Sequence, residues 1–323
     1  MFPHFTFGAF QHTIERSGVT DIQHFAFQLG WQAWQDNAWK GSLATMKIDA
    51  HQHFWKYNER EYGWMSDEMD VLRRDFLVED LAAVQDPIGF DGAVTVQARM
   101  TVEETEWLLS IAEKAPRILG IVGWVDFCAE NVREDLDRFA DHPKAVGFRH
   151  VVHDEPDDEY MLRPDFLRGL GILNDYDLTY DLLTFAKHLP VAEKVVQQFP
   201  DLPFVLDHIS KPFIKDGTVS PWDDDLRALA SYDNVACKLS GMVTEADWGN
   251  WKPEDFTSYM DIVLEAFGPN RLMIGSDWPV CTLAGNYGEV MGIVVDYIKK
   301  LSGDEQARIL GGTCAEFYRL PDE

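Results

Sequence analysis

Short apolar segments alternate with longer amphipathic segments along most of this chain. The apolar segments are rich in Val, Ile, Leu and Phe, and their length is that of strands rather than helices. Eight of them occur, at residues 47–51, 92–97, 119–125, 145–150, 178–183, 204–208, 235–239 and 271–276. We therefore predict eight strands.

The segments between the strands are typical of amphipathic helices. They cover residues 102–115, 131–140, 164–175, 191–199, 224–231 and 253–267, and a further helix at 288–301 follows the last strand. Strands that alternate with helices predict βαβ units and a parallel sheet. Eight units between Met46 and Glu323 match a barrel whose usual length is about 250 residues. The predicted fold is a single-domain α/β protein, a (β/α)8 TIM barrel over residues 46–323.

A doubly wound open sheet is the alternative fold for the same alternation. Such sheets commonly bind nucleotides at a Gly-rich loop that follows a strand. No predicted strand is followed by a GxGxxG or GxxxxGK sequence. The barrel is therefore preferred, and it predicts that catalytic groups lie at the carboxyl ends of the strands.

The first 45 residues do not share this pattern. They hold Phe, Gln, His and Trp without clear periodicity, and they lack the basic start and apolar centre of a signal peptide. Met46 immediately precedes the first predicted strand. We therefore predict that translation starts at Met46 and that residues 1–45 are an upstream extension or a start-site error. The alternative is an arm that packs on the barrel or on a neighbouring subunit.

Charge narrows the range of partners. Lys and Arg number 28 against 55 Asp and Glu, which gives a formal charge of −27. So acidic a surface repels nucleic acids and anionic membranes, and no apolar run approaches the roughly 20 residues of a membrane span. We expect a small-molecule substrate, no nucleic acid and no membrane. The charge indicates either a well-solvated cytoplasmic surface or adaptation to high salt.

The cysteines agree with a cytoplasmic location. There are four, Cys128, Cys237, Cys281 and Cys314, and they are far apart in the sequence. None belongs to a zinc-binding pattern, and reduced thiols are typical of cytosolic proteins. We predict free, buried thiols without a catalytic role.

Chemically active side chains stand at the carboxyl ends of the predicted strands. Strand one ends in His51-Gln52-His53, and residues i and i+2 of a strand point to the same face, so the two imidazoles project together. Other strand ends carry Arg149, His150, His208 and Asp277, and Asp181 lies within the fifth strand. The barrel is expected to gather these side chains at one mouth.

Each candidate has a catalytic and a structural interpretation. The Asp277 carboxylate, beside Trp278, could act as a general base. Its alternative role is structural, as the N-cap of a helix. His208 suits an oxyanion donor, a metal ligand or a proton shuttle, and its alternative is a histidine bonded to backbone at the rim. Arg149 and His150 point to opposite faces, and we predict that Arg149 points inward to bind carbonyl or hydroxyl oxygens.

Four further residues are candidate substrate contacts. A buried Asp181 needs a partner, which we predict to be a histidine or an arginine of the same group. Lys211 either neutralises an anionic product or is a solvated cation at the rim. Trp55 and Trp278 either form a wall for a sugar ring or pack in the core.

Seven segments, most of which contain these candidate residues, occur in the order found in a known family. They are Ile48-Asp49-Ala50-His51-Gln52-His53-Phe54-Trp55, Leu72-Arg73-Arg74-Asp75-Phe76, Val122-Gly123-Trp124-Val125-Asp126, Gly147-Phe148-Arg149-His150-Val151-Val152, Leu206-Asp207-His208-Ile209-Ser210-Lys211-Pro212, Lys238-Leu239-Ser240-Gly241 and Gly275-Ser276-Asp277-Trp278-Pro279-Val280. From Met46 to its end the chain resembles the amidohydrolase superfamily, of the amidohydrolase 2 type. Within it, the chain is similar to the sugar-lactonase branch typified by L-fuconolactonase and L-rhamnonolactonase.

The resemblance implies roles for the catalytic residues. Asp277 would activate a water molecule for attack on a carbonyl. The three histidines, His51, His53 and His208, would polarise the lactone carbonyl or hold an ion that does so.

The resemblance also bears on the cofactor. The wider superfamily completes its metal site with a strand-four lysine or carboxylate and a strand-five histidine, whereas this chain has Arg149 with His150 and Asp181 at those places. A binuclear centre is therefore not expected. The prediction is no required cofactor, or one divalent ion, zinc before others, on His51, His53 and Asp277.

The predicted function is hydrolysis of a sugar lactone, such as L-fuconolactone or L-rhamnonolactone, to the aldonic acid. The alternatives are a decarboxylase of the same superfamily, a metal-dependent hydrolase of another lactone, and a non-catalytic sugar-binding barrel. The sequence leaves open the sugar, the ring size and the oligomeric state, a homo-oligomer included.

Overall fold

The computed structural model describes residues 46–320. The predicted N-terminal extension, residues 1–45, lies outside the described residues, so both interpretations of it stay predictions. Among the helices of residues 46–320, none is long and apolar enough to cross a membrane.

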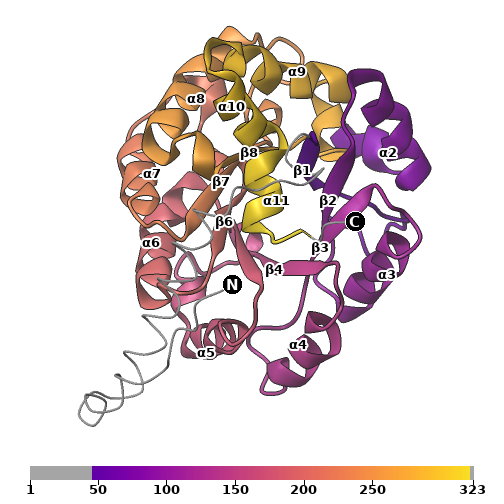
Figure 1. Cartoon of the computed structure of the whole chain (residues 1–323). Coiled ribbons are helices and arrows are strands. Elements are labelled where there is room, and N and C mark those ends of the chain that lie inside the picture. Colours follow the sequence, from indigo (N-terminus) through magenta and orange to yellow (C-terminus); the bar gives the residue numbers. More distant parts are fainter. Residues whose placement is uncertain (1–45, 321–323) are drawn as a thin grey trace, which may run out of the picture. The chain divides into compact units, whose positions relative to one another are not determined.

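Eight parallel strands form the barrel, and each strand pairs with the next one along the chain. The strands are β1 (Ile48–Gln52), β2 (Gly92–Val96), β3 (Ile118–Gly123), β4 (Ala145–Val151), β5 (Thr179–Leu183), β6 (Phe204–Leu206), β7 (Val235–Leu239) and β8 (Leu272–Ile274). Figure 1 shows the helices surrounding this ring. The predicted (β/α)8 barrel is confirmed, and each predicted strand is present with ends that shift by no more than two residues.

The helices lie between consecutive strands and after β8. They are α2 (Val78–Gln85), α3 (Val102–Ala112), α4 (Val132–Ala140), α5 (Pro164–Leu173), α6 (Leu189–Gln198), α7 (Trp222–Ala230), α8 (Glu254–Phe267), α9 (Tyr287–Tyr297), α10 (Gly303–Ala307) and α11 (Thr313–Phe317). The apolar pattern does not predict α2, which is short and follows a long loop. Its first turn is fixed locally, because the Leu77 N–H donates to Asp80 Oδ2 at 3.0 Å.

Apolar side chains fill both sides of the strands. Outward-facing residues such as Phe148, Tyr180 and Phe204 pack against the helices. A smaller cluster of Val, Ala, Ile and Met side chains lies inside the barrel and includes Tyr318 from the C-terminal segment. Helix α11 lies beside β1 and β8 near the centre of the ring in Figure 1. This packed interior places the polar groups at the carboxyl ends of the strands.

Strand β1 contains a β-bulge where the polar groups begin. Its pairing with β2 gains one residue on β1 between Asp49 and Gln52. Ala50 packs with the apolar residues inside the barrel, and the next residue, His51, also faces inward, toward Lys238. An extra residue in one strand re-aims a side chain in this way. In a regular strand, Ala50 and His51 would point to opposite faces. Because of the bulge, both side chains point into the barrel.

Candidate active site

The two histidines of β1 lie side by side, as their spacing predicts. The Nε2 atoms of His51 and His53 are 3.2 Å apart, and both imidazoles are almost fully buried. The Nδ1 atom of His53 is 2.7 Å from the carbonyl oxygen of Val96. Since a carbonyl only accepts, Nδ1 carries a proton, and in the neutral ring Nε2 then presents a lone pair to the site.

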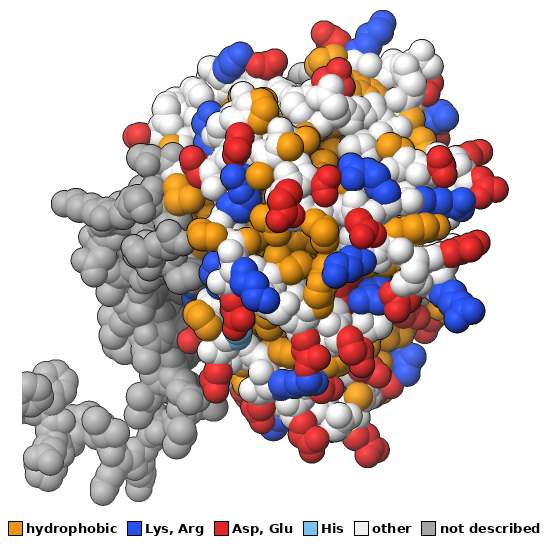
Figure 2. Space-filling view, turned by 90° about the vertical axis from the view of Figure 1, so that its right-hand side faces the viewer, with side chains coloured by type: hydrophobic (Ala, Val, Ile, Leu, Met, Phe, Trp, Pro, Cys, Tyr) orange, Lys and Arg blue, Asp and Glu red, His pale blue; other side chains and the backbone are white. Residues whose placement is uncertain are grey.

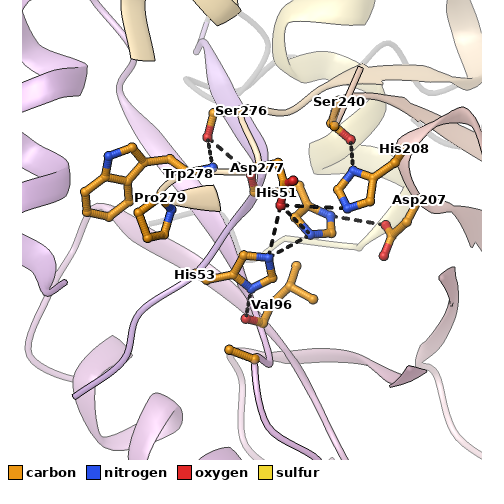
Figure 3. Close-up of polar contacts among 12 residues, drawn as sticks. His51, His53, Val96, Asp207, His208, Ser240, Ser276, Asp277, Trp278 and Pro279 are labelled. Carbon is orange, nitrogen blue, oxygen red and sulfur yellow. Dashed lines mark hydrogen bonds and ion pairs between the residues drawn. The ribbon is translucent and has the colours of Figure 1, made fainter. Parts of the chain in front are cut away.

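Asp277 joins this pair from the end of β8. Its N–H donates to the carbonyl of His51 at 2.8 Å, and the His53 N–H donates to the carbonyl of Trp278 at 2.7 Å. Asp277 adopts a left-handed backbone with φ of 56°, a conformation that is rare outside glycine and frequent at functional sites. These constraints aim its carboxylate at the histidines, as Figure 3 shows.

One oxygen of Asp277 faces three imidazoles. Asp277 Oδ1 is 3.3 Å from His53 Nε2, 3.9 Å from His51 Nε2 and 3.8 Å from His208 Nε2. The sequence places these four residues at the ends of three different strands. The structure therefore brings together all four residues predicted to be catalytic.

His208 reaches the cluster through an unusual turn after β6. Residues His208, Ile209, Ser210 and Lys211 all have φ between 47° and 60°, so they form one left-handed turn. Each such non-glycine residue costs about 1–2 kcal/mol. The turn is held by a bond from the Trp222 indole N–H to the carbonyl of Ile209 at 2.8 Å.

A second contact sets the ring of His208. His208 Nδ1 lies 2.8 Å from the Ser240 hydroxyl. On the other side, a Cβ added at Gly241 would lie 2.5 Å from the His208 ring. The ring is therefore fitted against bare backbone at the end of β7, with Nε2 directed at Asp277.

A buried set of charges supports His51 from below. Asp207 Oδ1 is 3.2 Å from His51 Nδ1, and Asp207 Oδ2 accepts from Arg149 Nη1 at 2.9 Å. Lys238 Nζ lies 2.9 Å from Asp207 Oδ1 and 3.2 Å from His51 Nδ1. Arg149 thus faces inward, as the alternation along β4 predicts, but its guanidinium is bound to protein groups.

The predicted partner of Asp181 is wrong. Its carboxylate accepts from Lys238 Nζ at 2.7 Å and from the Tyr318 hydroxyl at 2.6 Å, rather than from a histidine or an arginine. Asp181 lies deep in the barrel, where the C-terminal segment reaches it, so the nearest cation comes from β7. The carboxylate is fully buried, and both of these partners are protein groups.

The electrostatics of the cluster favour an ionised Asp277 beside neutral His51 and His208. Burial acts to raise the pKa of Asp277, but His208, His53 and His51 outweigh it and hold the pKa well below its usual value. Burial lowers the pKa of His208 to about 4 and that of His51 well below its usual value. At neutral pH the site therefore holds an ionised Asp277 beside uncharged imidazoles of His51 and His208.

The charges below the cluster compensate each other. Burial acts to raise the pKa of Asp207, but Lys238, His51 and Arg149 outweigh it and hold the pKa well below its usual value. Burial raises the pKa of Asp181. Burial would lower the pKa of Lys238, but Asp181 and Asp207 raise it. The carboxylates of Asp181 and Asp207 are therefore balanced by the ammonium of Lys238 and the guanidinium of Arg149.

The donor set at the mouth fits one divalent ion. We place the Nδ1 proton of His51 toward Asp207, because that carboxylate is its acceptor. The Nε2 lone pairs of His51 and His53 then face the same point, which is the arrangement of metal-binding histidines whose second nitrogen is hydrogen-bonded. The ligand atoms of His51, His53 and Asp277 lie within 4.8 Å of one another.

Arg149 offers the same nitrogen another partner. Its Nη1 atom is 3.2 Å from His51 Nε2, and a guanidinium N–H only donates. His51 Nε2 is therefore hydrogen-bonded to Arg149 in this structure, and a bound ion would have to compete with that bond.

The side chains of Lys211 and Trp55 bind groups outside the cluster of Asp277 and the three histidines. Lys211 is 13 % exposed and pairs with Glu245 at 2.8 Å, three residues beyond His208. Trp55 is fully buried, and its indole N–H donates to the carbonyls of Leu72 and Arg74.

Trp278 and His150 are held by aromatic neighbours. Trp278 is 3 % exposed and packs edge-on against Phe54 and Phe76. His150 is stacked on Tyr160 at 4.9 Å, on the outer side of β4. Neither tryptophan predicted as a sugar wall has a ring face open in this structure.

The sequence interpretation missed three residues of the site, Asp207, Lys238 and Ser240. Lys238 carries the same signal that marked Asp181, a charged residue within a short apolar strand. Buried opposite charges must pair, so the same signal indicates Lys238 as a partner for Asp181, although β6 lies between their two strands. Asp207 and Ser240 stand next to strand ends, where sequence alone does not distinguish a turn residue from a support for a histidine.

Comparisons with known proteins agree with this geometry. The sequence profile of the Amidohydrolase family matches residues 48–320. An L-fucono-1,5-lactonase of Burkholderia multivorans is 39% identical over 87% of this chain and 98% of its own length, and one of Burkholderia ambifaria is 35% identical over 85% and 96%.

A solved structure shows the same likeness. The crystal structure of an amidohydrolase from Burkholderia multivorans with bound zinc has a TM-score of 0.83 and 39% identity, and the alignment covers 85% of this chain and 100% of that one. The match of the family profile and of both relatives extends over nearly all the described barrel. This chain belongs to the amidohydrolase family.

Proposed function

We propose that this protein hydrolyses a sugar lactone of the aldonolactone class to the aldonic acid. The observation that carries the proposal is the Asp277 carboxylate, ringed by three imidazoles at the carboxyl ends of the barrel strands. The L-fucono-1,5-lactonase relatives support a deoxyaldonolactone such as L-fuconolactone as the first substrate to test.

The proposed reaction needs one base and few donors, because a lactone is an activated ester. Asp277 takes a proton from water as the water oxygen attacks the lactone carbonyl. The ring C–O bond then breaks, and the proton passes to the departing ring oxygen. The product is an open-chain hydroxy acid.

His208 is the donor for the tetrahedral oxyanion in this proposal. The Ser240 hydroxyl can donate to His208 Nδ1, which places the ring proton on Nε2, on the side of Asp277. His53 cannot serve while neutral, because its proton is already given to Val96. A positioned donor of this kind is worth about 10²–10³ in turnover.

One divalent ion, with zinc preferred, is part of the proposal as an option. When bound by His51, His53 and Asp277, it would polarise the carbonyl and lower the pKa of a bound water. The structure of the Burkholderia multivorans amidohydrolase with bound zinc supports this choice of metal. The predicted substrate contacts Arg149, Asp181, Trp55, Trp278 and Lys211 keep that role only as a proposal, and Lys211 is the most exposed of them.

The free state of all four cysteines supports a cytoplasmic location. A role in carbohydrate metabolism follows from the proposed substrate.

The test is a pH-indicator screen of five- and six-carbon aldonolactones and deoxyaldonolactones, with and without chelator. We expect acid release from at least one lactone. Asp277→Asn should lower kcat by at least about 100-fold while lactone binding is retained. The exposed carboxylate of Asp296, which pairs with Lys299 on the surface, gives the control Asp296→Asn, whose kcat should equal that of the wild type.

The other outcomes separate the alternatives. Release of carbon dioxide from an aromatic acid would identify a decarboxylase. Binding of lactones by both forms without turnover would identify a sugar-binding barrel. Activity lost in chelator and restored by zinc would make the ion a required cofactor.

A further inference from the structure

The β1–β8 joint of the barrel carries the catalytic groups of both strands. Strand β8 is only three residues long, and its pairing with β1 consists of an isolated bridge between Gln52 and Trp278. The backbone bonds across this joint come from Asp277 and His53. The alignment of base and histidines therefore depends on how this one joint is closed.

Asp49 closes the joint with its side chain. Its Oδ1 accepts from the Ser276 N–H at 2.9 Å and from the His51 N–H at 3.2 Å. Its Oδ2 accepts from the Ser276 hydroxyl at 2.6 Å and from the Tyr287 hydroxyl at 3.0 Å. A single carboxylate therefore binds the residue that precedes Asp277 and the first residue of the histidine pair.

The bulge explains why a carboxylate stands there. The extra residue of β1 removes the regular ladder partner of the His51 N–H. The short β8 leaves the Ser276 N–H without one as well. Buried N–H groups need acceptors, and Asp49 supplies both from one oxygen. Asp49 is fully buried, and no Lys or Arg of the described barrel forms an ion pair with it.

Ser276 extends the support to the other side of Asp277. Its hydroxyl oxygen accepts the Trp278 N–H at 2.9 Å while its proton goes to Asp49. The residues on both sides of Asp277 are thus tied to the same hydrogen-bonded pair. Asp277 itself adopts the left-handed backbone, which needs such support.

We propose that Asp49 and Ser276 are positioning residues, which lock the bulge of β1 onto the end of β8 and so hold Asp277 at the histidines. This inference rests on the proposed lactone hydrolysis for its kinetic consequence. The joint itself can be tested without any substrate.

The test compares two hydroxyl deletions at the same carboxylate oxygen. Ser276→Ala removes the donor that belongs to the catalytic strand. Tyr287→Phe removes the donor from α9, outside the barrel, and both hydroxyls are buried. A purely structural role predicts the same loss from both changes, whereas a positioning role predicts a difference.

We expect Ser276→Ala to lower kcat on the best lactone by about 10- to 100-fold, as small misplacements of catalytic groups do, with KM within about twofold. In Tyr287→Phe, kcat should stay within about twofold of the wild-type value, although its melting temperature should fall by about as much as that of Ser276→Ala. Ser276→Thr, which restores the hydroxyl, should recover most of the kcat. Equal losses in Ser276→Ala and Tyr287→Phe, or an unchanged kcat in Ser276→Ala, would overturn the proposal.

Hydrogen exchange keeps the proposal testable if the lactonase activity is refuted. In the wild-type chain and both variants, amide exchange is followed in the segments around His51 and Trp278. Faster exchange at these amides in Ser276→Ala but not in Tyr287→Phe supports the joint even without a lactone substrate. Equal exchange in the two variants would overturn it, whatever the substrate.

Discussion

At the scale of single residues, Lys238 shows how a buried charge is tied to its surroundings. Its ammonium is fully buried between Asp181 and Asp207 at 2.7 and 2.9 Å. If one charge of such a buried set is removed, the remaining charges stay buried without a partner, which typically lowers stability by about 3–5 kcal/mol. This loss is larger than that from any single surface ion pair.

We therefore predict that Lys238→Met lowers the free energy of unfolding by about 3–5 kcal/mol. The control is Lys300→Met, which breaks a half-exposed pair with Asp261 at 2.7 Å and should cost about 0–1 kcal/mol. Urea unfolding at neutral pH gives both values. If the two variants are equally stable, the buried cluster does not have the compensating role assigned to it.

The residues predicted to be catalytic could be selected from the sequence by their position along the strands, whereas the residues that support them could not. His51, His53, His208 and Asp277 stand at strand ends, where a barrel places its chemistry. Arg149 was predicted to face inward, but nothing in its neighbours along the chain shows that Asp207 would occupy its guanidinium. Such a partner comes from another strand, and its identity depends on the register between strands.

At the scale of elements, the left-handed turn after β6 depends on the backbone of β7. Gly241 has φ of 62°, and a Cβ there would lie 2.5 Å from the ring of His208. Gly217 has φ of 63°, but nothing lies within 4 Å of its Cβ position. The two glycines share a positive φ and differ in what surrounds their Cβ positions.

This difference predicts the outcome of two alanine substitutions. Gly217→Ala should cost about 1 kcal/mol of stability through its positive φ alone and leave turnover unchanged. Gly241→Ala carries the same backbone cost and also displaces His208, so kcat should fall by at least about tenfold.

Lactone turnover and thermal unfolding of both variants check this prediction. Equal turnover in the two variants would show that the fit of His208 against Gly241 is not needed for catalysis.

The elements themselves were predictable to different degrees. The eight strands are short apolar runs bounded by polar residues, so their positions follow from hydrophobicity alone. The bulge in β1 was not predictable, because it is a mismatch between two paired strands and leaves no mark in either sequence. Helix α2 escaped prediction because its length gives too few turns for a periodic pattern.

At the scale of the whole molecule, the surface combines a large net charge with many local ion pairs. The formal charge is −27, yet the face in Figure 2 shows Lys and Arg side chains interspersed among Asp and Glu. Exposed pairs such as Arg133 with Asp175 and Lys299 with Asp296 offset part of the repulsion nearby. Each is worth about 0–1 kcal/mol, so net repulsion acts mainly over longer distances.

The dependence of stability on salt distinguishes long-range repulsion from local ion pairs. It also distinguishes an ordinary well-solvated surface from adaptation to high salt. The screening length falls from about 30 Å at 0.01 M to about 8 Å at 0.15 M salt, which removes long-range repulsion and leaves close pairs largely intact. We therefore predict that the free energy of unfolding rises over this range and then levels off, as expected for an ordinary well-solvated surface. Urea unfolding in NaCl and, as a control against specific ion binding, in KCl measures it. A rise that continues into molar salt would instead indicate adaptation to a high-salt habitat, and a fall would show that close ion pairs outweigh the net charge.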